Sequence, residues 1–287
     1  MKKLNYFTAC MLLASATFFA CESDQVMKEE TVSPEVMARL TDLGFDVTDQ
    51  APLIFEEGYL VEGDIYLTDA DLARMKAGVR VPVEEQYSTN NLVTTGGNRV
   101  ITVYAPEASS GGGKGKKGGG SGYSAGMIAG LDLAISRYNA QNLEISFQRV
   151  TSSSNADIVM TRLSKGDERR GVLGSAGFPT ASGDPYGEIK MSGVLESSYG
   201  LSTAGIATII AHEMGHCVGF RHTDYFDRSI SCGGGTSNEG DGGVGANHIP
   251  GTPTGATASA KSWMLACTDG GDRPFNNDDR TALNYLY

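Results

Sequence analysis

The sequence predicts an α+β fold in which a small unit precedes a larger domain. Three observations indicate this class. Short segments with β-branched residues and alternating apolar positions, which are typical of strands, recur on both sides of a helical segment. Residues 123–139 carry apolar side chains at the helical period, and residues 204–218 form a second expected helix. Residues 231–260 are rich in Gly, Thr and Asn, which is typical of loops.

Length and charge limit the possibilities further. A chain of 287 residues is long enough for one large domain or two modest ones. Its formal net charge of −11 argues against nucleic acid as a partner, because no basic stripe is present to neutralise phosphates. No apolar run reaches the length that spans a bilayer, so we expect membrane contact through a lipid anchor only. We also expect a monomer.

The first 30 residues are expected to be a targeting segment. Residues 1–20 combine two lysines near the start with a mostly apolar stretch, as in a signal peptide. The sequence that ends at Cys21 resembles a loose bacterial lipobox, which makes Cys21 the lipidated residue. Residues 21–30 then form a polar, acidic tether, and Glu22 favours the outer membrane or the cell surface. The alternative is an ordinary secretory signal and a secreted protein, in which Cys21 is incidental.

Residues 31–97 are expected to form the small N-terminal unit. Ser33 is the expected N-cap of a first short helix, which a glycine ends. Residues 59–67 show a strand-like alternation that a glycine interrupts. A second short helix follows, capped by Thr68 or Asp69. A unit of this size would be only marginally stable alone.

Residues 98–287 are expected to form the larger domain. Its predicted strands share β-branched content and apolar alternation, and they are 99–104, 143–150, 157–162 and 187–195. Residues 109–122 are nearly all Gly, Ser and Lys, so we expect a solvated, flexible surface loop rather than a polyanion site. Residues 171–179 are apolar but interrupted by glycines. This pattern favours an edge strand with bulges, or a place where another backbone approaches closely.

A helix with two histidines is the most informative part of the chain. His212 and His216 are four residues apart, so on a helix they lie on one face and can bind the same Zn²⁺. Glu213 lies roughly 100° round the helix, where it can reach a water on the metal. Gly219 accepts the positive φ that ends a helix, so the chain can turn and bring His222 to the same ion. Three histidines leave a fourth coordination position open, as in a catalytic zinc site.

The pattern His-Glu-x-x-His-x-x-Gly-x-x-His of residues 212–222 resembles the metzincin signature. This resemblance covers residues 98–287 and implies a metzincin-like catalytic domain, with a twisted mixed sheet, two long helices and a loop-rich C-terminal subdomain. Within metzincins the chain is similar to the bacterial dual-action HEIGH metallopeptidases, whose helix motif has isoleucine in place of Met214. Residues 58–65, Gly-Tyr-Leu-Val-Glu-Gly-Asp-Ile, also resemble their N-terminal region. In metzincins the strand that corresponds to residues 171–179 borders the cleft and pairs with an extended substrate.

The sequence Ser262-Trp263-Met264 resembles the Met-turn of metzincins. The resemblance implies that Met264 forms an apolar floor under the histidine ligands and does not bind the metal. Astacins and serralysins carry a tyrosine two residues after this methionine, where this chain has Ala266. The resemblance therefore leaves open which group takes the role of that tyrosine.

The sequence Gly63-Asp64-Ile65 resembles the aspartate switch of astacin-type propeptides, in which the aspartate occupies the open zinc position and keeps the enzyme latent. A carboxylate is a competent fourth ligand, so Asp64 is a candidate latency ligand. The family pattern has Phe two residues before the glycine, where this chain has Val61. The alternative is an aspartate in a tight turn, for which Gly-Asp is ordinary sequence.

Three cysteines follow Cys21. Cys217 lies inside the histidine-bearing helix and is expected to be a small buried apolar residue. Cys232 and Cys267 both lie in irregular segments, so they are the favoured disulfide in an oxidising compartment.

Other polar residues near the C-terminus are weaker candidates for sites. Glu239, Asp241 and Asn247 would offer oxygen ligands to Ca²⁺, but their spacing fits no known loop motif. A solvated polar loop is therefore the preferred interpretation. His248 has no recognisable spacing to the other histidines and is expected at the surface.

Together these features predict a zinc-dependent endopeptidase that acts on an extended peptide or protein. The resemblance implies that zinc activates a water and polarises the scissile carbonyl, while Glu213 takes the proton of the water and passes it to the leaving amine. Asp224 either holds a histidine ligand or caps the turn after the helix. Two other functions stay open: a catalytically silent, zinc-containing surface binding protein, and a zinc amidase or deacetylase acting on a non-peptide amide.

Overall fold

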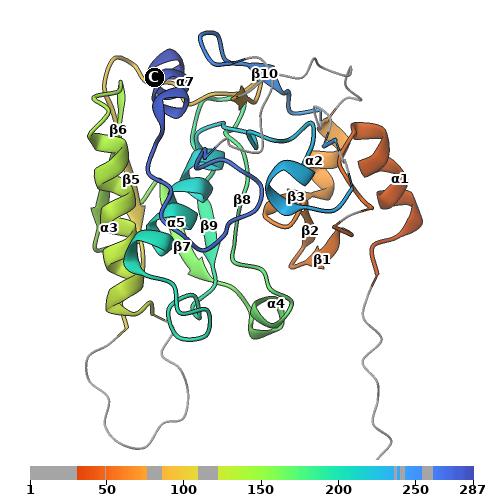
Figure 1. The fold of residues 1–287 in the computed structure, drawn as a ribbon, viewed down its shortest axis with the longest axis horizontal. Helices are drawn as coiled ribbons and strands as arrows, with labels where there is room; N and C mark the ends of the chain where they lie inside the picture. The colour runs from red at the N-terminus through yellow and green to blue at the C-terminus, as the bar shows by residue number, and fades with distance from the viewer. Residues whose placement is uncertain are drawn as a thin grey trace, which may run out of the picture. The chain divides into compact units, whose positions relative to one another are not determined.

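An eight-stranded mixed sheet forms the centre of the part of the chain that the structure describes (Figure 1). The computed structural model describes residues 31–48, 50–75, 86–108, 122–235, 238–239, 243–253 and 261–287. The strands lie in the order β1-β2-β3-β8-β9-β7-β5-β6. Their bounds are β1 Leu53–Phe55, β2 Gly58–Val61, β3 Ile65–Thr68, β5 Arg99–Tyr104, β6 Ile145–Val150, β7 Ile158–Arg162, β8 Gly174–Ala176 and β9 Glu188–Met191. This combination of a mixed sheet with helices confirms the predicted fold class.

The pairing of the strands joins the N-terminal part of the chain to the rest. Strands β6, β5, β7 and β9 pair in parallel, and β8 is antiparallel to β9. Strands β1, β2 and β3 form an antiparallel meander, and β3 then pairs in parallel with β8, where Ile65 lies opposite Ala176. The sheet therefore continues across the boundary predicted near Asn98, and the boundary itself stays a prediction.

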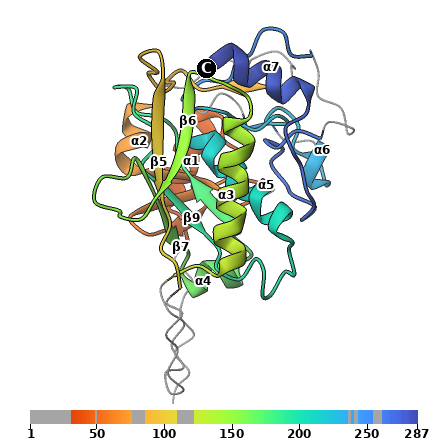
Figure 2. The same cartoon turned by 90° about the vertical axis from the view of Figure 1, so that its left-hand side faces the viewer.

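Two long helices cover one face of the sheet, with α3 in front of the strands and α5 beside it in Figure 2. They are α3 (Ala125–Asn139) and α5 (Thr203–Cys217), and a serine side chain caps the N-terminus of each. The two helices approach closely because Gly130 of α3 has no side chain: a Cβ there would lie 2.5 Å from Ile206 Cγ2. The core between sheet and helices therefore fixes the position of α5, which carries the histidine motif.

The N-terminal segment has a small apolar core of its own, which includes residues of β2, β3 and both of its helices. Helix α1 (Pro34–Leu43) begins after the cap Ser33 and ends at Gly44, whose φ is +96°. Helix α2 (Asp69–Arg74) begins after Thr68, which forms a capping box with Asp71. Both helices lie where the sequence predicts them, because their start and stop signals are local.

The remaining elements are short. They are α4 (Lys165–Arg169), α6 (Ser229–Cys232), α7 (Asn277–Leu286), β4 (Tyr87–Ser88) and β10 (Asn247–His248). Strands β4 and β10 pair with each other, and Ser88 also bridges to Phe220. Tyr87 O accepts a hydrogen bond from Arg221 N at 2.9 Å, and Thr89 N donates to Gly219 O at 2.8 Å. Residues 87–89 thus contact the chain that follows α5.

Several predicted features lie outside the described residues. They are the signal peptide and tether with Cys21, residues 109–121 of the Gly-rich loop, and Asp241. The glycine-interrupted segment 171–179 contributes only three residues to a strand, β8, and the strand predicted at 187–195 is reduced to β9. Within the described residues, no helix has the length and apolar character that crossing a bilayer needs.

Candidate metal centre

Helix α5 places the two helical histidines of the motif and the glutamate between them in the protein interior. His212, Glu213 and His216 are all buried, and α5 ends at Cys217. Gly219 follows with a φ of +103°, a backbone conformation that favours glycine. The chain turns there, and His222 comes back beside the two helical histidines, as the spacing predicts. The ring centroid of His222 lies 5.2 Å from that of His212 and 4.9 Å from that of His216.

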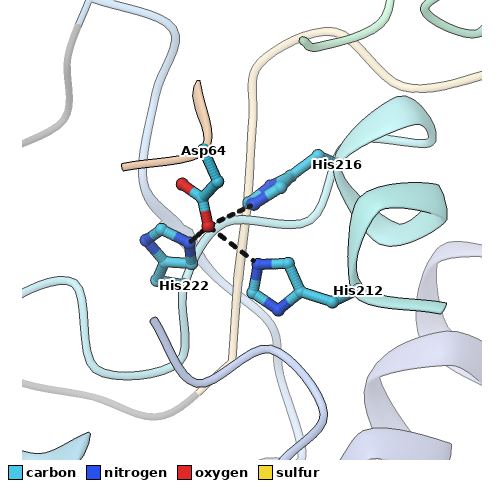
Figure 3. A group of neighbouring side chains, drawn as sticks. All are labelled: Asp64, His212, His216 and His222. Atoms are coloured by element: carbon cyan, nitrogen blue, oxygen red, sulfur yellow. Dashed lines mark hydrogen bonds and ion pairs between the residues drawn. The ribbon is translucent and has the colours of Figure 1, made fainter. Parts of the chain in front are cut away.

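The Nε2 atoms of the three histidines face one carboxylate oxygen (Figure 3). Asp64 Oδ2 lies 3.2 Å from Nε2 of His212, 3.1 Å from Nε2 of His222 and 3.9 Å from Nε2 of His216. One atom from each of these four side chains lies within 4.8 Å of the others. The structure therefore brings the three predicted ligands and the predicted latency residue into one cluster.

The other ring nitrogen of each histidine is held by an acceptor. His212 Nδ1 lies 2.9 Å from Trp263 O, and His216 Nδ1 lies 2.9 Å from Phe220 O. His222 Nδ1 lies 2.9 Å from Glu239 Oε1. Carbonyl and carboxylate oxygens only accept, so each Nδ1 carries a proton, and Nε2 is the nitrogen that can bind a metal.

This donor set fits a metal ion. Three Nε2 atoms and a carboxylate oxygen converge, and each can donate a lone pair to the same cation. Tetrahedral coordination with bonds of 2.0–2.1 Å places ligand atoms about 3.3 Å apart, close to the separations from Asp64. Burial lowers the pKa of His216 to about 4, which keeps its imidazole neutral, as a ligand must be. Its Nε2 has no hydrogen-bond partner among the described atoms.

Glu213 lies beside this cluster without belonging to it. Its side chain is buried, and burial together with the charge of Asp64 raises the pKa of its carboxyl well above the ordinary value. Glu213 Oε2 has no hydrogen-bond partner among the described atoms. Glu213 reaches strand β8, where a Cβ on Gly174 would lie 2.9 Å from its Cδ and closer still to Oε1. The glycine that interrupts this strand therefore makes room for a carboxylate.

Gly174→Ala is expected to displace the Glu213 carboxylate and to lower peptidase activity by about 10²-fold, the cost of a 1 Å misplacement. Metal content should not change, because Gly174 contacts Glu213 and not a histidine. Gly187→Ala is the matched control, since a Cβ there would meet only Asp157 O at 3.7 Å. Equal activity of the two variants, with metal content measured on both, would contradict this role for Gly174.

Glu239 contacts His222, and the sequence analysis did not predict this contact. It is fully buried and accepts from His222 Nδ1, from Arg228 Nη1 at 3.0 Å and from Arg221 Nη2 at 3.5 Å. Burial alone would raise the pKa of its carboxyl, but His222 and the two arginines hold it well below the ordinary value. Glu239 thus orients His222, a candidate metal ligand, and it is not the solvated residue that the sequence suggested.

The Ca²⁺ candidates do not form a group in the described structure. Asn247 Nδ2 donates to Asn90 Oδ1 at 3.0 Å, and Asp241 is outside the described residues. His248 lies away from the metal cluster: its Nε2 is 3.0 Å from Thr252 Oγ1.

The Met-turn segment packs beneath α5. A Cβ on Gly215 would lie 2.5 Å from Met264 Sδ, so the glycine lets the methionine approach the helix. Met264 O accepts from Thr223 N at 2.8 Å, next to His222, and the preceding residue Trp263 holds His212 through its carbonyl. Met264 therefore packs against α5 close to the histidines, and its role as a Met-turn stays a prediction.

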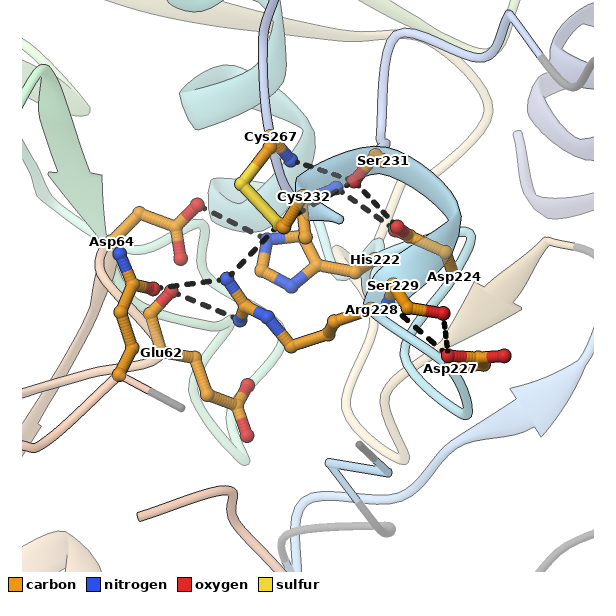
Figure 4. Close-up of a disulfide and its surroundings, with 12 residues drawn as sticks. Glu62, Asp64, His222, Asp224, Asp227, Arg228, Ser229, Ser231, Cys232 and Cys267 are labelled. Carbon is orange, nitrogen blue, oxygen red and sulfur yellow. Dashed lines mark hydrogen bonds and ion pairs between the residues drawn. A yellow bond between two sulfur atoms is a disulfide. The ribbon is translucent and has the colours of Figure 1, made fainter. Parts of the chain in front are cut away.

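Asp224 supports the turn and does not contact a histidine. Its Oδ1 accepts from Ala266 N at 2.9 Å and its Oδ2 from Ser231 Oγ at 2.5 Å. The predicted disulfide, Cys232–Cys267, ties the same two segments together (Figure 4). Of the two roles open for Asp224, the structure supports the cap. Cys217 is a buried free thiol.

A cavity of about 230 Å³ opens beside His212 and Glu213. It lies between α5, the segment after the Met-turn and residues 62–64 of the N-terminal segment. Ala266 lines this cavity, and no tyrosine is among the described residues that do so. No tyrosine of this lining therefore takes the place of the Met-turn tyrosine of astacins.

Comparison with known proteins gives the family. The GM1-bound form of the ECX AB5 holotoxin is 16% identical over 69% of this chain and 81% of that chain, with a TM-score of 0.35. Two structures of myroilysin are 15% and 16% identical over 64% and 76% of this chain and 90% and 95% of those chains, each with a TM-score of 0.35. No curated protein matches. A family model described as dual-action HEIGH metallo-peptidase matches residues 59–287, a range that includes both Asp64 and the histidine motif. The chain therefore belongs to the dual-action HEIGH metallopeptidases.

Proposed function

We propose that this metallopeptidase is a zinc-dependent endopeptidase that Asp64 keeps latent until the N-terminal segment moves. The observation that carries the proposal is the convergence of three Nε2 atoms and Asp64 Oδ2, while every Nδ1 is held by an acceptor. Family membership supports a peptide or protein as the substrate.

His212, His216 and His222 would hold the zinc ion, because borderline-soft imidazoles are among its preferred ligands. When bound, zinc lowers the pKa of water and polarises a carbonyl group. Each histidine ring is kept in orientation by an oxygen that accepts from its Nδ1. Trp263 O holds His212, Phe220 O holds His216, and Glu239 Oε1 holds His222.

Glu213 is the proposed general base. Its side chain is adjacent to the histidines on α5, is not one of the clustered ligands and has an oxygen without a hydrogen-bond partner among the described atoms. A carboxylate whose pKa is raised accepts a proton more readily than an ordinary one. Glu213 would take a proton from the attacking water and donate it to the leaving amine.

Strand β8 is the proposed docking edge for the substrate. In the latent chain β3 occupies this edge, and Ala176 N donates to Asp64 O at 3.0 Å. An extended peptide would use the same donors by β-strand addition after β3 departs. The adjacent cavity, lined by the apolar side chains of Leu173, Ile209 and Leu265 together with polar groups, would receive one substrate side chain.

Latency follows from the same contacts. Asp64 Oδ2 lies 3.2 Å, 3.9 Å and 3.1 Å from Nε2 of His212, His216 and His222, where a fourth ligand of the ion would lie. A charged carboxylate there would exclude the attacking water. Peptide access would also be blocked, because β3 covers the edge of β8.

Cleavage of denatured casein by the full-length chain after limited proteolysis tests the function. We expect cleavage that a zinc chelator abolishes and that added Zn²⁺ restores, with about one zinc per chain by elemental analysis. Zinc binding without cleavage of any protein would support the binding-protein alternative. Hydrolysis of an acetylated lysine substrate instead of casein would support the deacetylase alternative.

A further inference from the structure

Arg228 lies where the N-terminal segment meets the metal centre (Figure 4). Its Nη1 donates to Glu62 O and to Glu239 Oε1, both at 3.0 Å, and its Nη2 donates to Gln50 Oε1 at 3.0 Å. Two of these three oxygen acceptors belong to the N-terminal segment. With the segment in place, the Arg228 side chain is only 5% exposed.

Arg228 is also close to the reacting end of the cleft. It shares Glu239 Oε1 with Nδ1 of the ligand His222. The residue whose carbonyl it contacts, Glu62, is two positions before Asp64, whose side chain faces the histidines. A peptide that takes the place of this stretch therefore passes Arg228 within a few residues of the bond next to the metal.

Departure of the N-terminal segment changes the hydrogen bonds of the Arg228 guanidinium. Arg228 keeps Glu239 but loses Glu62 O and Gln50 Oε1, so donors directed toward the cleft become available. Guanidinium donors that lack acceptors in a partly desolvated site are costly. A carboxylate is the acceptor that best matches the planar fork of arginine, because it can accept two parallel hydrogen bonds.

The latent chain already accommodates an acidic side chain at this place. The Glu62 side chain is buried, and burial together with the charge of Glu239 raises the pKa of its carboxyl well above the ordinary value, while Arg221 and Arg228 act in the opposite direction. One of its oxygens, Oε2, has no hydrogen-bond partner among the described atoms. The site thus has space for a carboxyl group close to Arg228, whose charged form Arg228 favours and Glu239 opposes.

We propose that Arg228 determines the specificity of the activated enzyme by pairing with an acidic side chain of the substrate within a few residues of the scissile bond. This inference rests on the proposed endopeptidase function. Arg228 is a binding residue in this proposal, with no part in proton transfer. Glu239 holds the guanidinium in position before the substrate arrives.

Pairs of fluorogenic peptides that differ only by Glu or Gln at one position test the proposal. Each position within three residues of the scissile bond is varied, and the enzyme is the full-length chain activated by limited proteolysis. At one position we expect kcat/KM for the Glu peptide to exceed that for the Gln peptide by about tenfold or more, as for one charge-assisted pair. Arg228→Gln should reduce this ratio to about one, and Arg228→Lys should give a smaller reduction, because it keeps the charge but loses the fork.

The ratio separates recognition from structural damage. If replacing Arg228 only disturbs Glu239 and His222, kcat/KM falls for both the Glu and the Gln peptide, and the ratio between the two peptides stays unchanged. Arg280→Gln, at an exposed position on α7, is the matched control and should keep the full ratio. If Arg228→Gln does not fold, the ratio in Arg228→Lys decides.

Two results would overturn the inference alone: an active enzyme without a Glu preference at any position, or a preference that both Arg228 variants retain. An activated chain that cleaves neither these peptides nor casein would instead refute the proposed function, and the inference with it.

Discussion

Replacing Glu213 with glutamine is expected to lower kcat/KM for peptide cleavage by about 10²–10⁴-fold, the usual contribution of a general base. Glutamine has nearly the same shape but does not accept the proton of the attacking water. Metal content should stay at the level of the unmodified chain, because Glu213 is not among the clustered ligand atoms. Steady-state kinetics on the activated chain, together with elemental analysis, measure both quantities.

Glu107→Gln provides the matched control for this experiment. Glu107 is a largely exposed carboxylate that pairs with Arg149, so its loss should leave both activity and metal content unchanged. Normal peptide cleavage by the Glu213→Gln chain would show that another group is the base. Loss of the metal in that variant would show instead that Glu213 supports the ligands.

The second large effect is expected from Asp64→Ala in the unprocessed chain. Removing the carboxylate eliminates its contacts with the histidines, which opens the fourth position to water and weakens the attachment of the segment that covers β8. Activity should rise by about 10- to 100-fold above that of the unprocessed parent, as expected for the loss of one strong charge-assisted contact. Casein cleavage before any proteolytic treatment is the measurement.

Asp42→Ala is the control for this effect. Asp42 is another aspartate of the N-terminal segment, but it is exposed on α1 and pairs only with Arg39 among the described residues. It should leave the unprocessed chain as inactive as the parent. Full activity of the parent before processing, unchanged by Asp64→Ala, would refute the switch and would restore the tight-turn interpretation of Gly63-Asp64.

Much of this fold can be predicted from the sequence because the signals for it are local. Ser33 and Thr68 start helices through caps that need only their neighbours. The spacing of His212 and His216 fixes their common face, and Gly219 takes the positive φ that its position suggests. Each of these features is decided within one or two turns of chain.

Long-range pairings account for most of what the sequence does not reveal. Strand β3 joins β8 more than 100 residues away, and no local pattern selects that partner. Glu239 follows His222 by 17 residues and lies in an irregular segment with many glycines, so no helical or strand period connects it to His222. Nothing in the sequence distinguishes Arg228 from a surface arginine. In the fold it is buried and donates a hydrogen bond to Glu62 O. A search for acidic residues downstream of the motif would have found Glu239 only as one of several candidates.

Residues 86–89 support the segments around the metal centre, although they precede the boundary predicted at Asn98. Tyr87 and Thr89 hydrogen-bond to the turn between α5 and His222. Gln86 Nε2 donates to Asp279 Oδ1 at 2.6 Å and to Ser262 Oγ, in the segment that resembles the Met-turn, at 3.1 Å. A maturation cut that removes Asp64 and yields a stable enzyme should therefore fall before Gln86. Amino-terminal sequencing of the mature form tests this expectation, and a fully active enzyme that begins at Asn98 would contradict it.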